Sequence, residues 1–342
     1  MYERFFQLAK TPFSLVSDPD FIHLTAQHEN VIRGLAFAVL ERRGYLVLTG
    51  EAGLGKTTTL RALAEILAES NVQSSVILTP TLTPSEFLEL LMLNFGFNEI
   101  PASKAQRLKL LENFLIRSDA AGRVSALVVD EAHQLSEELL EEIRLLGNFE
   151  VADRKLLQIV LAGQSEFNDQ LNLPHMWHLK QRIAIRLSLR RLKREAVEEY
   201  IQYRWSAAGA TGPSPFTDDA VDAVAAWSYG IPRLINTICD NALLIAFSET
   251  IRTLNVEIIR EACIDLRLPT PAFAPRPRAL EPPPTKSQRE PTAPPLADQL
   301  QPVALASGRP EPRPSFLNRL RRRPRQATST KGSIFSLNEP VR

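Results

Sequence analysis

The chain has 342 residues, of which 44% are hydrophobic, and a formal net charge of +1. This is enough for one sizeable α/β domain and a smaller companion. Its two cysteines, Cys239 and Cys263, lie far apart without metal-ligand spacing, which excludes a disulfide framework and predicts small core residues in a reducing compartment. No run approaches 18 apolar residues and the N-terminus lacks a signal-peptide pattern, so we expect a cytoplasmic protein.

The charge is unevenly distributed along the chain. Residues 1–268 carry 27 Lys and Arg against 34 Asp and Glu, whereas residues 269–342 carry 13 against 5 and hold 16 of the 25 prolines. The acidic body argues against wrapping a long stretch of nucleic acid, and the Pro/Arg-rich tail is predicted to be disordered. Its cationic segment 316–325 is either a solvated linker or a docking site for an acidic partner, nucleic acid or anionic lipid. Membrane contact would then be indirect, through this tail.

The first predicted elements are a leader and a helix. Residues 1–27 form an extended, aromatic-rich leader that we expect to pack on the core, either covering apolar surface or also contacting a ligand. A helix is predicted from His28 to about Arg42, and the apolar run Tyr45–Thr49 predicts a buried strand.

A glycine-rich loop follows this strand. The run Gly50–Thr57 reads GEAGLGKT and precedes a predicted helix from Thr58 to Glu69, which is the context of a phosphate-binding loop. Glycines allow a tight turn whose N–H groups face an anion, assisted by the helix dipole. Lys56 is placed to reach the β and γ phosphates and Thr57 to bind Mg²⁺. We therefore expect a nucleotide site, and the leader either contacts its base or only covers apolar surface. The predicted binding residues are Gly50, Glu51, Ala52, Gly53, Leu54, Gly55, Lys56, Thr57 and Thr58.

Further strands and helices alternate. A strand near Val76–Thr79 precedes the capping box Thr83–Glu86, which opens a helix to about Asn94. Another helix is predicted from Ser103 to about Ser118. This alternation predicts right-handed crossovers and a mostly parallel sheet in a P-loop αβα sandwich.

The run Ala126–Glu131 is apolar until it ends in two carboxylates, as expected for a strand buried on both faces that opens into a site. Because ligands of parallel sheets bind at the carboxyl ends of strands, Asp130 should meet the glycine-rich loop and hold Mg²⁺. Glu131 is placed to orient and deprotonate an attacking water. Asp130–His133 also spells the box of one helicase class, although no second motor domain is visible.

Two further polar candidates lie downstream, after a helix capped by Ser136 that ends at Leu146 and a strand at Leu156–Ala162. Gln164 either contacts the γ-phosphate or the attacking water, or is a plain loop residue. Arg182 is our first choice for an arginine that stabilises the transferring phosphoryl group in a neighbouring subunit. Arg186, four residues later, and an ordinary surface salt bridge remain open.

From about Lys193 the pattern becomes helical. Arg233 lies at the start of one predicted helix, where a cation opposes the helix dipole, and this indicates an external anion such as the phosphates. The predicted helices are 194–208, 218–228, 232–247 and 255–266, with Thr217 and Asn255 as caps of the second and fourth. The predicted domains are a leader 1–27, a core 28–192, a helical lid 193–268 and a disordered tail 269–342.

The motifs GEAGLGKT, LVVDEAH, LAGQSE, KQRI and GIPRLIN, in this order over about residues 1–267, resemble the AAA+ ATPases of the ExeA/GspA general secretion group. The resemblance implies a P-loop core with a helical lid that forms homo-oligomers with ATP sites at subunit boundaries. Secretion members carry a membrane span and a peptidoglycan-binding domain after the lid, where this chain has its basic tail. The implied roles are Walker A for Lys56 and Thr57, Walker B for Asp130 and Glu131, sensor 1 for Gln164, finger for Arg182 and sensor 2 for Arg233.

Three functional hypotheses follow. The leading one is an ATP-hydrolysing, Mg²⁺-dependent switch whose lid movement remodels or recruits a protein partner in envelope export. A DNA-associated helper of transposition or DNA loading is the alternative, and it predicts salt-sensitive duplex binding. A module that uses ATP only as structural glue is disfavoured by the intact Glu131.

Overall fold

The computed structural model describes the chain except residues 16–17, 19–20, 79–80, 153 and 272–342. The predicted disorder of the tail therefore concerns a segment that lies, from residue 272 on, outside the described residues. In chain order the elements are α1 (Tyr2–Phe5), α2 (Ala26–Leu40), β1 (Tyr45–Thr49), α3 (Lys56–Glu69), β2 (Val72–Ile77), α4 (Pro84–Asn94), α5 (Lys104–Ala120), β3 (Val124–Val129), the 3₁₀ turn η2 (Ala132–Gln134), α6 (Glu137–Leu146), β4 (Glu150–Val151), β5 (Arg154–Lys155), β6 (Leu157–Gly163), α7 (Glu166–Leu171), η3 (Pro174–Met176), α8 (Trp177–Lys180), β7 (Ile183–Ser188), α9 (Arg194–Ala207), α10 (Asp218–Ser228), α11 (Pro232–Ser248) and α12 (Val256–Asp265).

Five parallel strands form the main sheet, in the order β2-β3-β6-β1-β7. Strands β1, β3 and β6 are buried at every residue and rich in Leu, Val and Ile, as expected for strands covered on both faces. Thr49 pairs with Gly163, and Val129 with Leu161. The connections that follow β1, β3 and β6 therefore leave the sheet at one edge.

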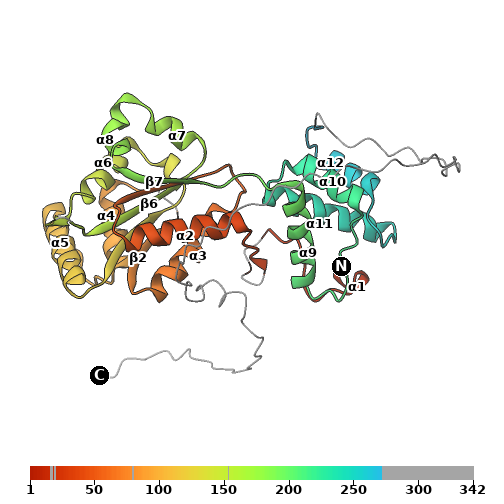
Figure 1. The fold of residues 1–342 in the computed structure, drawn as a ribbon, viewed down its shortest axis with the longest axis horizontal. Helices are drawn as coiled ribbons and strands as arrows, with labels where there is room; N and C mark the ends of the chain where they lie inside the picture. The colour runs from red at the N-terminus through yellow and green to blue at the C-terminus, as the bar shows by residue number, and fades with distance from the viewer. Residues whose placement is uncertain (16–17, 19–20, 79–80, 153, 272–342) are drawn as a thin grey trace, which may run out of the picture. The chain divides into compact units, whose positions relative to one another are not determined.

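Helices cover both faces of this sheet (Figure 1), and each face has its own hydrophobic cluster. One cluster joins alternate strand residues, such as Leu46, to the buried sides of α2 and α3. The other joins the intervening residues, such as Val47, to α4, α5, α6, α7 and α8. This is the predicted αβα sandwich, and the fold class is confirmed.

The strand expected near Val76–Thr79 begins earlier than predicted, at Val72, and ends at Ile77. The prediction was wrong because Gln73, Ser74 and Ser75 look like loop residues. Within the sheet two of them are satisfied by a neighbouring segment: Asn94 donates to the Ser75 hydroxyl at 3.0 Å, and Gln73 donates to the Phe95 carbonyl at 3.1 Å.

Strand β7 was not predicted. Its residues alternate between half-buried Ile183, Ile185 and Leu187 and exposed Ala184, Arg186 and Ser188. Ile185 and Leu187 pack on the cluster of α2 and α3, whereas Ile183, on the other side of a register shift, packs on the opposite cluster. The alternation is visible in the sequence, but the charged Arg186 in its middle makes it look like an exposed polar segment.

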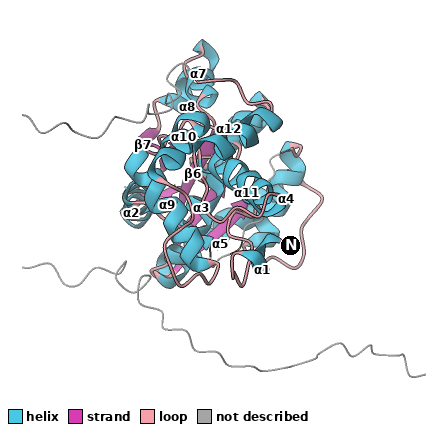
Figure 2. Ribbon diagram, turned by 90° about the vertical axis from the view of Figure 1, so that its right-hand side faces the viewer, coloured by secondary structure: helices cyan, strands magenta, loops and turns pink. Residues whose placement is uncertain are grey.

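The second half of the described chain contains helices α9 to α12, which appear in cyan in Figure 2. Each matches a predicted helix to within one or two residues at its ends. Asn255 caps α12 by accepting from the Ile258 amide at 3.3 Å. Thr217 directly precedes α10, but its hydroxyl donates to the Leu254 carbonyl at 2.9 Å and forms no capping hydrogen bond with the helix.

The leader differs from the expectation that it packs on the core. Its buried side chains Tyr2, Leu8, Phe13 and Phe21 belong to the hydrophobic cluster of α9 to α12. The buried Arg204 of α9 explains this placement, because its guanidinium donates to the carbonyls of Pro12 at 2.6 Å and Ser14 at 3.0 Å. Among the described residues, none of the helices has both the length and the apolar character that a bilayer crossing requires.

Candidate functional site

The glycine-rich loop turns tightly where β1 ends. Gly53 and Gly55 have φ of +83° and +90°, a region that favours glycine, and Gly55 directly precedes α3. Gly50 does not share this conformation. A Cβ there would lie 3.2 Å from the Leu189 Cβ and backbone oxygen, so its small size serves close packing rather than a special turn.

Lys56 is buried beneath the loop that precedes it. Its ammonium donates to the carbonyls of Gly50 at 2.9 Å and Glu51 at 3.1 Å. Burial lowers the pKa of this ammonium, while the nearby carboxylates of Glu131 and Asp130 act in the opposite direction. The helix begins at Lys56, two residues before the predicted start, so the ammonium stem leaves from the first turn of α3.

Thr57 and Asp130 meet between the loop and the end of β3. The Thr57 hydroxyl donates to Asp130 Oδ2 at 2.5 Å, and the Glu131 amide donates to Asp130 Oδ1 at 2.8 Å. Asp130 is only 1% exposed, so its carboxylate is held in one orientation. A hydroxyl and a carboxylate beside a phosphate loop are oxygen ligands of the kind that Mg²⁺ uses with nucleotides, and the residues present fit that ion.

Glu131 follows Asp130 in the left-handed region, with φ of +51°, and its side chain lines the same cavity as the loop. Gln164, the first residue after β6, also lines this cavity. The carboxyl ends of three adjacent strands, β1, β3 and β6, thus bring the predicted residues together as expected from parallel topology.

The cavity has a volume of about 650 Å³ and extends beyond the loop. Leader residues from Phe21 to Thr25, together with Tyr200, Arg204 and Asn236 of the helical region, line its other side. Arg233 lines it as well, and the Arg233 amide donates to the Gly53 carbonyl at 3.3 Å. Of the predicted loop residues, Ala52, Gly53, Leu54, Gly55, Lys56, Thr57 and Thr58 line the cavity, whereas Gly50 and Glu51 do not.

Two side chains that contact the loop were not predicted from the sequence. Buried His28 lies under the loop, with its Nε2 3.0 Å from the Leu54 carbonyl and its Nδ1 2.8 Å from the Thr25 hydroxyl. Burial lowers the pKa of this imidazole. Arg191 forms a bidentate ion pair with Glu51, in which the shortest distance is 2.7 Å between an Arg191 Nη atom and Glu51 Oε2. A single His or Arg has no spacing pattern, so only the fold could reveal these contacts.

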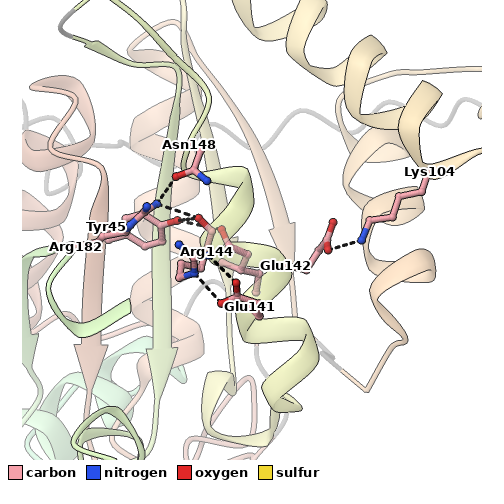
Figure 3. A network of polar contacts seen from close by, with 8 residues as sticks. Tyr45, Lys104, Glu141, Glu142, Arg144, Asn148 and Arg182 are labelled. Carbon is pink, nitrogen blue, oxygen red and sulfur yellow. Dashed lines mark hydrogen bonds and ion pairs between the residues drawn. The ribbon is translucent and has the colours of Figure 1, made fainter. Parts of the chain in front are cut away.

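Arg182 and Arg186 lie elsewhere. Arg182 directly precedes β7 at the amino end of the sheet, and neither arginine is among the cavity-lining residues. Figure 3 shows the Arg182 guanidinium turned toward the end of α6, where it donates to the Arg144 carbonyl at 3.1 Å and to Asn148 Oδ1 at 2.6 Å. Arg182 therefore contacts no part of its own chain's predicted nucleotide site, and Arg186 is exposed on the edge strand.

Comparison with known proteins gives matching results. A family model described as an AAA domain matches residues 39–171. General secretion pathway protein A of Aeromonas hydrophila is 38% identical over 252 residues, which are 72% of this chain and 45% of that protein. The chain therefore spans less than half the length of this relative.

Solved structures with a similar fold include Cdc6p from Pyrobaculum aerophilum, with a TM-score of 0.56 and 17% identity over 74% of this chain and 70% of that one. The Aeropyrum pernix ORC2 protein in its ADPNP-ADP complexes gives 0.55 and 15% identity over 75% and 71%. Drosophila ORC bound to DNA gives 0.58 and 19% identity over 77% and 66%. At these identities the likeness concerns the fold alone.

Proposed function

Because this chain belongs to the AAA+ proteins of the ExeA/GspA type, we propose that it binds ATP with Mg²⁺ and hydrolyses it to ADP and phosphate in the cavity beside the glycine-rich loop. The observation that carries the proposal is the hydrogen bond of 2.5 Å between the Thr57 hydroxyl and Asp130 Oδ2. It joins the two predicted Mg²⁺ ligands, which are 73 residues apart in sequence, at the point where Lys56 and Glu131 also lie.

Each residue has a definite task in this reaction. Lys56 and the loop amides would hold the phosphate oxygens, and Thr57 and Asp130 would hold Mg²⁺, which neutralises charge on those oxygens. Glu131 would accept a proton from the attacking water. Gln164 would orient that water or the terminal phosphate, and Arg233 would contact the phosphates from the helical region.

Contacts that lead from the loop to the helical region support a switch. The Arg233 amide of the helical region donates directly to the Gly53 carbonyl. The end of the core also contacts both parts, because Arg191 pairs with Glu51 of the loop and the Leu192 amide donates to the Gly230 carbonyl at 2.8 Å. A shift of the loop on hydrolysis would thus reach residues 193–268, which we propose as the lid of a core at 28–192. In our proposal the chain works as a homo-oligomer, and lid movement remodels or recruits a protein partner in secretion.

The decisive experiment compares wild type with E131Q. Removing the proposed base should leave ATP affinity intact and lower turnover by about 10²- to 10⁴-fold. Both are measured by equilibrium binding of a fluorescent ATP analogue and by phosphate release. E138Q is the matched control, since Glu138 is an exposed residue of α6. Unchanged turnover in E131Q would refute the assignment of the base.

A DNA-associated role is the second candidate, because Drosophila ORC, which shares this fold, was solved bound to DNA. The same assay with added duplex at low and high salt decides between the two. A DNA helper should show ATP-dependent binding that weakens steeply with salt. Absence of both binding and stimulation at low salt would eliminate this candidate.

A further inference from the structure

His133 is the last residue of the AspGluAlaHis box, and the proposed function leaves it without a task. It lies in the short turn η2 that follows Glu131, and its side chain is 16% exposed. Its carbonyl accepts from Gln170 Nε2 of α7 at 2.9 Å, which fixes the turn against the segment that follows Gln164.

The imidazole lies between two functional groups. Its Nδ1 is 3.4 Å from Glu131 Oε2 and also 3.4 Å from the Gln164 backbone nitrogen. The carboxylate can only accept a hydrogen bond, and the amide can only donate one. Nδ1 in a neutral ring either carries a hydrogen or offers a lone pair, so it can serve only one of these neighbours at a time.

Glu131 depends on such a neighbour for its orientation. Its backbone has a left-handed φ of +51°, and within the described part of the chain its buried Oε2 receives no hydrogen bond. A carboxylate that lacks a fixed partner can rotate between the attacking water and other positions. His133 Nδ1 is placed to restrict that rotation.

We propose that His133 is a positioning residue that couples Glu131 to the strand end carrying Gln164. With the hydrogen on Nδ1, the ring donates to Glu131 and holds the carboxylate. With the hydrogen on Nε2, Nδ1 accepts from the Gln164 amide, and Glu131 turns to the water. The two states are the neutral tautomers of the imidazole, and they interconvert when one ring nitrogen gives its proton to solvent and the other takes one up. The inference rests on the proposed hydrolysis, which alone gives Glu131 its task.

The test uses two substitutions of His133 in the full chain. H133A removes both contacts and should lower kcat about 10- to 100-fold, the size of effect that losing the partner of a metal ligand has. The KM for ATP and the nucleotide Kd should stay within about twofold, because neither contact involves the phosphate loop. H133N retains an amide near the position of Nδ1 that can donate or accept, and it should recover part of the lost kcat.

H175A is the matched control, because His175 lies 3.2 Å from Glu137 in a far more exposed pair. It should turn over ATP like wild type. Wild-type kcat in H133A, while E131Q is inactive, would overturn the inference and leave the proposed function intact. A parallel loss of nucleotide affinity and thermal midpoint in both H133A and H133N would also overturn it, because His133 would then only support the fold. An inactive wild type would instead contradict the proposed function.

Discussion

The two ends of the parallel sheet carry polar clusters of opposite character. At the carboxyl end, Lys56 and Glu131 line a cavity beside the buried Asp130, and Glu131 Oε2 lacks a hydrogen bond within the described residues. At the amino end, Arg182 and Tyr45 donate to carbonyls in the last turn of α6 (Figure 3). The carboxyl end holds charged groups of which one oxygen has no hydrogen-bond donor. At the amino end, polar side chains donate to the last carbonyls of a helix, which have no partner within the helix.

This difference separates a site from a structural cluster. Removing the charges of Lys56 and Asp130 from water costs free energy, and the buried Glu131 Oε2 has no donor within the described residues. Together these features indicate that a ligand completes this end of the sheet. The amino-end groups need no ligand, because helix carbonyls satisfy them. To act as the proposed finger, Arg182 must therefore release Asn148 and contact a phosphate bound to a neighbouring subunit.

The largest effect is expected from removing the positive charge at the carboxyl end. K56A deletes the only side chain of the loop that carries an ammonium, and it should abolish ATP binding and, with it, hydrolysis. Equilibrium binding of the fluorescent analogue measures this directly. K109A, which changes a lysine that is 68% exposed on α5, is the control and should bind like wild type. Retained affinity in K56A would show that the loop does not hold phosphates.

The next effect concerns Arg182 and tests the amino end. If Arg182 acts on a neighbouring subunit, R182A should bind ATP normally and lose about 10³- to 10⁵-fold in turnover. Mixing R182A with K56A should then restore part of the activity, since each variant supplies what the other lacks. R186A tests the alternative arginine, which lies four residues later within β7.

N148A separates the structural contact of Arg182 from a catalytic one. It removes the 2.6 Å contact to Asn148 Oδ1 but keeps the guanidinium. We expect turnover at or above the wild-type level, because Arg182 can then move more easily toward a neighbouring subunit. If R182A and N148A lose stability equally and R182A keeps its turnover, Arg182 belongs only to the structural cluster.

The contrast also explains what the sequence could and could not predict. Buried strands β1, β3 and β6 are continuous apolar runs, so their ends, and with them Lys56, Asp130 and Gln164, could be placed from the pattern alone. Strand β2 could not be placed in this way. Its polar residues Ser75 and Gln73 find their hydrogen-bond partners in Asn94 and the Phe95 carbonyl, and the sequence does not show that these segments meet.

The residues that contact the glycine-rich loop from other elements could not be predicted from the sequence either. The contact of His28 with Leu54 joins residues that are 26 apart, and that of Arg191 with Glu51 joins residues that are 140 apart. Neither has a motif, and both depend on how helices and linkers return to the loop. The contacts of the leader with the helical region could not be predicted for the same reason, since Arg204, which donates to Pro12 and Ser14, looks in the sequence like an ordinary charged helix residue.

A smaller effect is expected from Y45F, which should change stability and leave catalysis intact. The buried Tyr45 hydroxyl donates to the carbonyls of Ile143 at 3.0 Å and Arg144 at 2.9 Å. Burial raises the pKa of Tyr45 to about 12, so the hydroxyl remains a donor at neutral pH. Its loss should cost about 1 to 3 kcal/mol in the free energy of unfolding, measured by urea denaturation. Y229F is the control, since Tyr229 is 41% exposed. A fall in ATP turnover without a fall in stability would break the distinction between the two ends.

The smallest effect concerns pH and His28 at the carboxyl end. Burial lowers the pKa of His28 in the folded chain, so between the folded and unfolded pKa values the unfolded chain binds more protons. The stabilisation is therefore complete above the unfolded value of about 6.5 and is lost as pH falls toward the folded value, by at most about 1.4 kcal/mol per pH unit. H28Q can still donate to the Leu54 carbonyl but does not titrate, so its free energy of unfolding should depend less on pH. Urea titrations of wild type, H28Q and the exposed-residue control H178Q at several pH values from about 5 to 7.5 measure the slopes. Equal slopes in wild type and H28Q would mean that His28 is not held neutral beneath the loop. Its burial would then not distinguish this end of the sheet from the other.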